Sequence, residues 1–184
     1  YNWTYQGLAL TVTGTMKPDG NDIAPGRVLE RPKVVYNKTT GKWVMFMHWE
    51  NGEHYGEAKV AIAQSDKIQG PYTHVRTVNP NGHDSRDQTL FVDTDGKAYH
   101  FGSTRMNSDM LITELTDDYL DFTENEYYAL PGRSFEAPAI FKIDDTYWGI
   151  FSGCTGWDPN PGRSAYTFDL MDDWTTGVNF AIDN

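Results

Sequence analysis

Three stretches of the chain repeat the same pattern of polar and apolar positions. Each opens on a charged residue, continues as an apolar run, meets a polar turn and resumes as an aromatic-rich run. Short apolar runs joined by turns rich in Asn, Asp and Gly are typical of β-hairpins. The opening runs are Glu30-Arg-Pro-Lys-Val-Val-Tyr36, Arg86-Asp-Gln-Thr-Leu-Phe-Val92 and Glu136-Ala-Pro-Ala-Ile-Phe-Lys142, and the turns that follow are residues 37–41, 93–96 and 144–145.

Each hairpin is followed by further strand-like runs, and helical periodicity is weak throughout. The repeats cover about residues 30–84, 85–133 and 134–184. A period near 50 residues of all-β character, with four short strands per unit, predicts the blades of a β-propeller. The further runs are residues 59–63, 72–76, 110–115 and 163–168, the third repeat ends near residues 180–182, and a separate run at residues 7–13 leads into a polar loop at 17–26.

The number of repeats bears on whether the ring is complete. Three blades and 29 preceding residues do not close a propeller, which usually has about four to eight blades. An open array would expose apolar blade faces and strand edges. We therefore expect residues 1–184 to form a single but incomplete propeller domain, whose missing blades come from the same parent protein.

An acidic residue stands at the start of each repeat. Glu30, Asp87 and Glu136 are separated by 57 and 49 residues. Equivalent strand starts converge on the axis of a propeller, so we expect the three carboxylates to face one funnel. Glycoside hydrolysis needs a carboxylic acid that protonates the leaving oxygen and a second carboxylate across the bond. Taken singly, such an acid is more often a turn or solubility residue, so the prediction rests on the repetition.

The neighbouring charge suggests how one of these acids is held. Arg86 directly precedes Asp87. A cation next to a carboxylate favours its ionised form. We therefore expect Arg86 to pair with Asp87.

The composition narrows the class of partner. The chain is 14% aromatic, has 17 glycines and 9 prolines, and carries a formal net charge of −11. The excess of acids argues against nucleic acid or an anionic membrane as partner, since both need a basic footprint. No apolar run approaches the roughly 18–20 residues that cross a bilayer, and the first residues show no signal-peptide pattern. A neutral ligand such as a sugar fits this composition.

Metal ligands are not indicated. His48, His54 and His83 lack the close spacing of a zinc site, and the single Cys154 also excludes an internal disulfide. Asp93-Thr-Asp-Gly96 resembles the opening of a calcium loop but lacks the acid that closes one. A hairpin turn explains this segment better, since Asp-Gly favours such turns. We therefore expect no cofactor, with a structural calcium ion left open.

Four motifs together resemble glycoside hydrolase family 43, most closely its galactan 1,3-β-galactosidase-like branch, from about residue 28 onward. The resemblance implies a five-bladed propeller, of which this chain covers about three to three and a half blades, and hydrolysis with inversion. The motifs are Ser85-Arg-Asp-Gln-Thr-Leu-Phe-Val-Asp-Thr-Asp-Gly-Lys-Ala-Tyr99, Leu111-Ile-Thr-Glu-Leu-Thr-Asp-Asp-Tyr-Leu120, Phe135-Glu-Ala-Pro-Ala-Ile-Phe-Lys142 and Ser152-Gly-Cys-Thr-Gly-Trp157.

The resemblance also implies roles for the three acids. Glu136 matches the general acid, and Asp87 matches the residue that modulates the acid. Glu30, in Glu-Arg-Pro-Lys-Val, matches a glutamate of the branch that contacts the sugar in the −1 subsite. The sequence departs from the general family at the base, because the first-blade Asp-Pro that usually supplies it is not seen.

Four further residues are candidate sugar contacts. Tyr55 matches a sugar contact of the branch, and Asn107 matches a position where the branch has asparagines, although Ser108 and Asp109 depart from its usual run. Trp157 lies on a loop rich in Gly and Pro and is expected to stack on the apolar face of galactose, although packing against a blade edge is the alternative. Thr155, beside it, is expected to hydrogen-bond a sugar hydroxyl.

The function predicted from these observations is release of galactose from the β-1,3-galactan chains of arabinogalactan. One alternative is an arabinofuranosidase or xylosidase of the same family, which shares propeller and acids. Another is a non-catalytic carbohydrate-binding propeller, which the absent base and the incomplete ring would favour. The polymeric substrate implies a secreted, cell-envelope or periplasmic protein.

Overall fold

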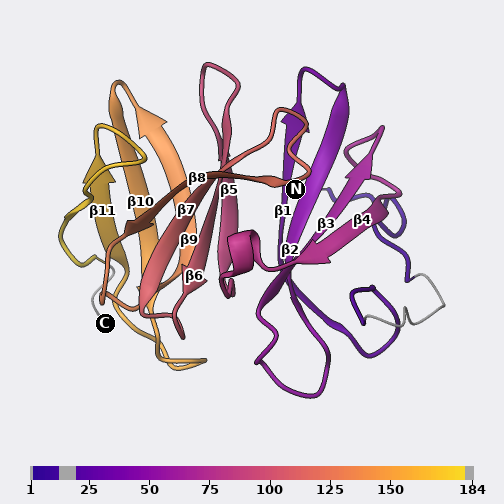
Figure 1. Cartoon of the computed structure of the whole chain (residues 1–184), viewed down its shortest axis with the longest axis horizontal. Coiled ribbons are helices and arrows are strands. Elements are labelled where there is room, and N and C mark those ends of the chain that lie inside the picture. The colour runs from indigo at the N-terminus through magenta and orange to yellow at the C-terminus, as the bar shows by residue number, and fades with distance from the viewer. Residues whose placement is uncertain (1, 13–19, 181–184) are drawn as a thin grey trace.

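The computed structural model of the chain describes residues 2–12 and 20–180, and these form three four-stranded antiparallel sheets (Figure 1). Within each sheet the strands are neighbours in sequence order. A short 3₁₀-helix, η1 (Pro80–Gly82), lies between the first two sheets. The sheets contain β1 (Val28–Asn37), β2 (Lys42–Glu50), β3 (Lys59–Ser65) and β4 (Thr73–Val78); β5 (Gln88–Val92), β6 (Ala98–Thr104), β7 (Asp109–Leu115) and β8 (Phe122–Ala129); and β9 (Phe135–Ile143), β10 (Thr146–Gly153), β11 (Arg163–Thr167) and β12 (Thr175–Thr176).

The three predicted hairpins are confirmed as β1–β2, β5–β6 and β9–β10. The turn at residues 93–96 is the hairpin turn that Asp-Gly predicts. Gly96 has a φ of +89°, and its N–H donates to the carbonyl of Asp93 at 3.0 Å. Glycine adopts this backbone region without steric cost, so the segment closes the β5–β6 hairpin.

β8 and residues 7–13 are two of the segments that differ from the sequence prediction. β8 was not predicted, because its Glu and Asn residues interrupt the apolar alternation; it is an outer strand whose Glu124 and Asn125 face solvent. Charged side chains on an outer strand discourage pairing with another chain. The predicted strand at residues 7–13 is wrong over its described part, where Leu10 makes a single bridge to Tyr72. Residue 13, residues 17–19 of the polar loop and residues 181–182 lie outside the described part.

Apolar residues of adjacent sheets form the core. In the first interface Phe46 and Ile62 pack against Leu90 and Leu115, and all four are buried. In the second, Phe101 and Ile112 belong to a buried cluster with residues of β9, β10 and β11. Each sheet therefore buries its faces against a neighbour, as the blades of a propeller do.

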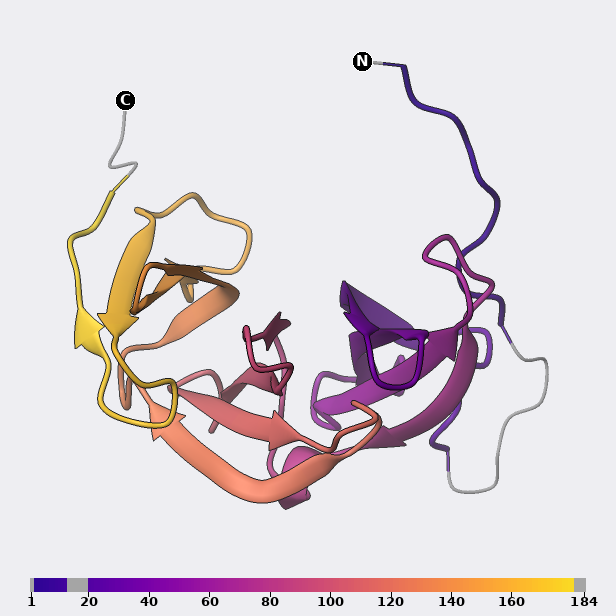
Figure 2. The same cartoon turned by 90° about the horizontal axis from the view of Figure 1, so that it is seen from above.

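The first strands of the three sheets are neighbours in space. β5 contacts both β1 and β9. Figure 2 shows the sheets side by side around an arc, with β5 on the concave side and β8 on the outer side. In Figure 1 the three hairpins point to the top, so the starts of β1, β5 and β9 lie toward the bottom. This arrangement brings three separate parts of the sequence to one place, and the all-β propeller class is confirmed.

At the hairpin end, Asn37 links the first two blades. Its side chain is buried, and its Nδ2 donates to the carbonyl of Asp117 at 2.7 Å. Its Oδ1 accepts the N–H groups of Thr39 and Thr40, each at 2.9 Å. The β1–β2 turn and the loop before β8 are thereby fixed to each other.

Within the described residues, the structure has no helix that is long and apolar enough to cross a membrane.

We predict that the interface between the first two blades contributes strongly to stability. Ile62→Ala should lower the free energy of unfolding by about 2–5 kcal/mol, because the fully buried side chain leaves a cavity. Ile68→Ala is the matched control, since Ile68 is 57% exposed, and should change it by less than about 0.5 kcal/mol. Urea unfolding of the two variants would measure both values. Equal losses would contradict this description of the core.

Candidate active site

A cavity of about 620 Å³ opens where the starts of β1, β5 and β9 meet. This volume is typical of sites that bind small molecules. Glu30, Asp87 and Glu136 all contribute to its wall, so the predicted convergence of the three acids is confirmed. The lining residues are Leu29, Glu30, Arg31, Pro32, His48, Tyr55, Arg86, Asp87, Asn107, Glu136, Gly156 and Trp157.

The two glutamates share an unusual backbone at the strand start. The residue after each has a positive φ, +50° at Arg31 and +49° at Ala137. The pairing register of β1 shifts between Glu30 and Lys33, and that of β9 shifts opposite residues 150–152. Such bulges are enriched beside active sites, where they re-aim a side chain. A Glu-x-Pro segment therefore directs a carboxylate to the cavity in both blades.

Asp87 is held by the blades on either side of it. Arg31 binds its carboxylate with two nitrogens, Nε to Oδ1 at 2.9 Å and Nη2 to Oδ2 at 2.8 Å. The N–H of Ala137 donates to Asp87 Oδ2 at 3.0 Å. Since Ala137 directly follows Glu136, this hydrogen bond fixes Asp87 beside the neighbouring acid.

The predicted pairing of Arg86 with Asp87 is wrong. Backbone hydrogen bonds between residues 86–87 and Ser103 show that this segment is extended, and adjacent side chains of an extended chain point in opposite directions. Arg86 instead pairs with Asp84 and donates to the carbonyl of Tyr55 at 3.3 Å. The cation that binds Asp87 comes from the first blade.

Asp84 holds the turn between β6 and β7. Its carboxylate accepts hydrogen bonds from Thr104 Oγ1 and the N–H groups of Arg105 and Met106, at 2.8, 2.8 and 3.2 Å. Burial of Asp84 opposes its ionisation. The hydrogen bonds from the turn and from Arg86 outweigh this effect and lower the pKa of Asp84 to about 2.

The same turn places Asn107 next to Glu136. Arg105, Met106 and Asn107 have φ values of +50°, +57° and +63°, a conformation that costs energy for residues other than glycine. Asn107 Nδ2 donates to Glu136 Oε1 at 2.7 Å. Its Oδ1 is buried and has no hydrogen-bond partner among the described residues. We infer that Asp84 offsets the strain of a turn that positions Asn107.

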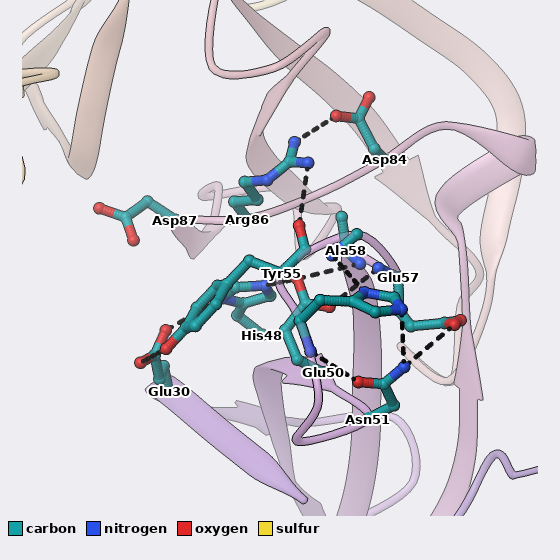
Figure 3. A network of polar contacts seen from close by, with 12 residues as sticks. Glu30, His48, Glu50, Asn51, Tyr55, Glu57, Ala58, Asp84, Arg86 and Asp87 are labelled. Carbon is teal, nitrogen blue, oxygen red and sulfur yellow. Dashed lines mark hydrogen bonds and ion pairs between the residues drawn. The ribbon is translucent and has the colours of Figure 1, made fainter.

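Tyr55 extends from the β2–β3 loop across the cavity to Glu30. Its hydroxyl donates to Glu30 Oε1 at 2.7 Å (Figure 3). The hydrogen bond to this carboxylate, together with burial and the charge of Glu30, raises the pKa of Tyr55. Tyr55 is therefore a stable donor that fixes one oxygen of Glu30.

The loop after β10 carries two candidate sugar-binding residues, Thr155 and Trp157, and they lie in different surroundings. Trp157 lines the cavity and its side chain is fully exposed, which agrees with a stacking platform rather than with packing against a blade edge. Thr155 does not line the cavity. Its hydroxyl donates to the carbonyl of Asp158 and accepts from Asn160 Nδ2, both at 2.6 Å. In this structure the hydroxyl of Thr155 therefore holds the turn of its own loop, and its contact with a sugar hydroxyl stays a prediction.

Cys154 lies close to the acids at the start of the same loop. Its Sγ donates to the carbonyl of Ser134 at 3.3 Å. Burial raises the pKa of the thiol to about 11, and the charge of Glu136 acts in the same direction. The thiol therefore stays protonated and is a poor nucleophile.

His54 and His83 make polar contacts with neighbouring groups. His54 accepts the N–H of Gly56 at 3.1 Å, and His83 contacts Glu126 and Tyr128. In the described part of the chain, no three His, Cys, Asp or Glu side chains gather in a metal-binding arrangement.

Sequence reasoning missed Arg31, His48, Glu50 and Asp84. Two of them left a signal. His48 and Glu50 alternate on β2 in line with the apolar Val44 and Phe46, so polar groups occupy core-facing positions. A polar residue in a core row indicates a hydrogen-bonded or functional role.

The blade arrangement and the acid-lined cavity define a propeller with the site architecture of a glycosidase. The sequence model for glycosyl hydrolases family 43 matches residues 2–166, and the chain belongs to that family. A comparison with curated proteins found no match.

Three solved structures of the family are similar over nearly the whole chain. One is a β-1,3-galactosidase with 60% sequence identity and a TM-score of 0.96 over 100% of this chain. A second is a β-1,3-galactosidase with galactodeoxynojirimycin, at 39% identity and a TM-score of 0.92 over 97% of this chain. The third is an exo-β-1,3-galactanase from Phanerochaete chrysosporium with β-1,3-galactotriose, at 32% identity and a TM-score of 0.84 over 97% of this chain.

The chain spans only part of each of these proteins. It covers 39%, 65% and 40% of their respective lengths.

We predict that the Tyr55–Glu30 contact can be followed by titration. In the native chain the hydroxyl of Tyr55 should lose its proton at a higher pH than an ordinary tyrosine, because ionisation places a second anion beside Glu30. Glu30→Gln should lower the pKa of Tyr55, whereas Glu53→Gln, in the same loop, should leave it unchanged. NMR of ¹³C-labelled tyrosine, with Tyr55→Phe for assignment, measures this. No change in Glu30→Gln would show that the two groups do not interact.

We predict that Asp84→Asn destabilises the fold in a pH-dependent way. The pKa of Asp84 is lower in the folded chain than the value near 3.9 of an unfolded chain. Its stabilising contribution is therefore present above about pH 4 and is lost as the pH falls toward 2. Urea midpoints of native and variant chains should differ at pH 7 and converge below pH 4.

Asp66→Asn is the control, because the Asp66 side chain is 79% exposed in its pair with Lys42. It should change stability little at either pH. A constant difference for Asp84→Asn across the range would contradict the role of the ionised carboxylate.

Proposed function

We propose that the protein is an inverting glycoside hydrolase that releases galactose from β-1,3-galactan. The observation that supports this most is the convergence of Glu30, Asp87 and Glu136 on one cavity. Similarity to β-1,3-galactosidases at up to 60% identity among the three structures described above supports the choice of sugar and linkage.

Glu136 is the proposed general acid. It transfers a proton to the glycosidic oxygen as the bond from that oxygen to the anomeric carbon breaks. A water molecule attacks the anomeric carbon from the opposite face and gives up its proton to a base, so the configuration inverts. Asn107 Nδ2 orients the Glu136 carboxyl through the 2.7 Å contact at Oε1.

Asp87 is the proposed modulator of the acid. Its bidentate pair with Arg31 fixes a carboxylate next to Glu136, and Ala137 N–H sets the distance between the two strands. A negative charge close to a carboxylic acid favours the protonated form of that acid. The acid is then ready to donate when the substrate binds.

The remaining wall is suited to a sugar in which one face is apolar. The exposed indole of Trp157 offers a stacking surface. Glu30 and Asn107 line the cavity, and the carboxylate of Glu30 is an acceptor for sugar hydroxyls. In this proposal Glu30 binds the terminal galactose in the −1 subsite.

The proposal extends to the biological setting. A polymeric galactan is degraded outside the cell or in the cell envelope, so we assign the protein to polysaccharide degradation in a secreted or periplasmic location. Further blades from the same parent protein would complete the five-bladed ring. The chain covers only part of the length of its relatives, which supports the proposal of further blades.

We predict that Glu136→Gln abolishes turnover while retaining affinity. The rate of galactose release from β-1,3-galactan should fall by at least about 10²–10⁴-fold, the usual contribution of general acid catalysis. The amide keeps the shape of the side chain, so binding of galactose should persist. Glu124→Gln, on the exposed face of β8, is the control and should keep the native rate. Full turnover by Glu136→Gln would remove Glu136 from the acid role.

The same assay separates the alternatives. Release of arabinose or xylose from their polymers, but not of galactose, would assign the chain to another activity of family 43. Binding of galactan without release of any sugar would identify a carbohydrate-binding propeller.

A further inference from the structure

A buried histidine links Glu30 to a second, buried carboxylate. His48 Nε2 lies 3.0 Å from Glu50 Oε1, and His48 Nδ1 lies 3.2 Å from Glu30 Oε2 (Figure 3). His48 is 2% exposed and Glu50 is 0% exposed. Glu30, at the outer end of this series, is 37% exposed and lines the cavity.

The inner end of the series is firmly held. Glu50 Oε1 also accepts the N–H of Ala58 at 3.1 Å, and its Oε2 accepts the N–H of Glu57 at 2.9 Å. A buried carboxylate that receives several hydrogen bonds is fixed in place, and removing one of its partners is costly. Glu50 thus anchors His48 and also ties down the end of the loop that carries Tyr55.

The outer contact is looser. Nδ1 lies 3.2 Å from Glu30 Oε2 but makes no aligned hydrogen bond among the described residues. Carboxylates only accept hydrogen bonds, so His48 serves both glutamates only through nitrogens that carry hydrogen. Tyr55 occupies the other oxygen of Glu30. Each oxygen of Glu30 is therefore restrained from a different element, Oε1 from the β2–β3 loop and Oε2 from β2.

We propose that His48 and Glu50 are positioning residues that orient the Glu30 carboxylate toward the terminal sugar. This inference rests on the galactosidase function proposed above, in which Glu30 binds that sugar. The buried Glu50 sets the plane of the imidazole, and the imidazole sets the side-chain torsions of Glu30. A misplacement of about 1 Å at a reacting centre costs on the order of a hundredfold in rate. The contacts from Glu50 through His48 to Glu30, called the tether below, therefore have a large effect on the rate although His48 and Glu50 do not touch the substrate.

Two substitutions at His48 separate the two ends of the tether. The amide nitrogen of Asn lies near the position of imidazole Nδ1, so His48→Asn keeps a donor toward Glu30. The amide nitrogen of Gln lies near Nε2, so His48→Gln keeps the donor toward Glu50 only. Both variants of the full chain should be assayed on β-1,3-galactobiose for kcat and KM, with thermal unfolding as the measure of stability.

The expected result is a loss of about ten- to a hundredfold in kcat/KM for His48→Gln, with a smaller loss for His48→Asn even where Asn destabilises the fold. A purely structural role predicts the reverse order, because Gln preserves the buried contact to Glu50. That reverse order would overturn the proposal.

The titration of Tyr55 provides a readout that does not require turnover. If His48 holds Glu30 in place, the fall in the pKa of Tyr55 caused by Glu30→Gln should be smaller in a His48→Gln background than in the native chain, since Glu30 is then no longer held against Tyr55. An equal fall in both backgrounds overturns the tether, also where His48→Asn fails to fold. If the native chain releases no galactose, the proposed function fails, while this titration still decides the tether.

Discussion

The site depends on one carboxylate that joins three blades. Asp87 belongs to the second blade, receives both nitrogens of Arg31 from the first and accepts the N–H of Ala137 from the third. A bidentate Arg–carboxylate pair is directional as well as strong, and the Asp87 side chain is only 16% exposed. The segments that carry Glu30 and Glu136 are therefore held relative to each other by contacts to the residue that lies between them.

The sequence predicted the features that depend on repetition. The Glu30, Asp87 and Glu136 segments each combine an apolar run with a turn of defined chemistry, and a propeller converts equivalent positions into neighbours. The local pattern of apolar and polar residues thus predicted the strands, and the propeller topology predicted that the three acidic side chains lie close together. The Asp-Gly turn at residue 96 could be predicted for the same reason, since its φ requirement is local.

Side-chain contacts between blades could not be predicted from the repeats, because they depend on the orientation of each side chain. The nearest cation in sequence, Arg86, turns to Asp84, while Arg31 reaches Asp87 over 56 residues. The partner of the Thr155 hydroxyl, the carbonyl of Asp158 in the same loop, could likewise not be predicted from the position of Thr155 beside Trp157. β8 shows the same limit for strands: its pairing with β7 stabilises a segment whose own pattern is polar.

The buried side chain of Asn37 has a consequence for covalent modification. Asn37-Lys38-Thr39 has the form of an acceptor site for N-linked glycans, and attachment of a glycan occurs at the amide nitrogen of asparagine. In the folded chain that nitrogen is hydrogen-bonded to Asp117 in the adjacent blade, and the residue is 1% exposed. An oligosaccharide at this position would separate the two blades, so the folded protein excludes glycosylation there although the sequence permits it.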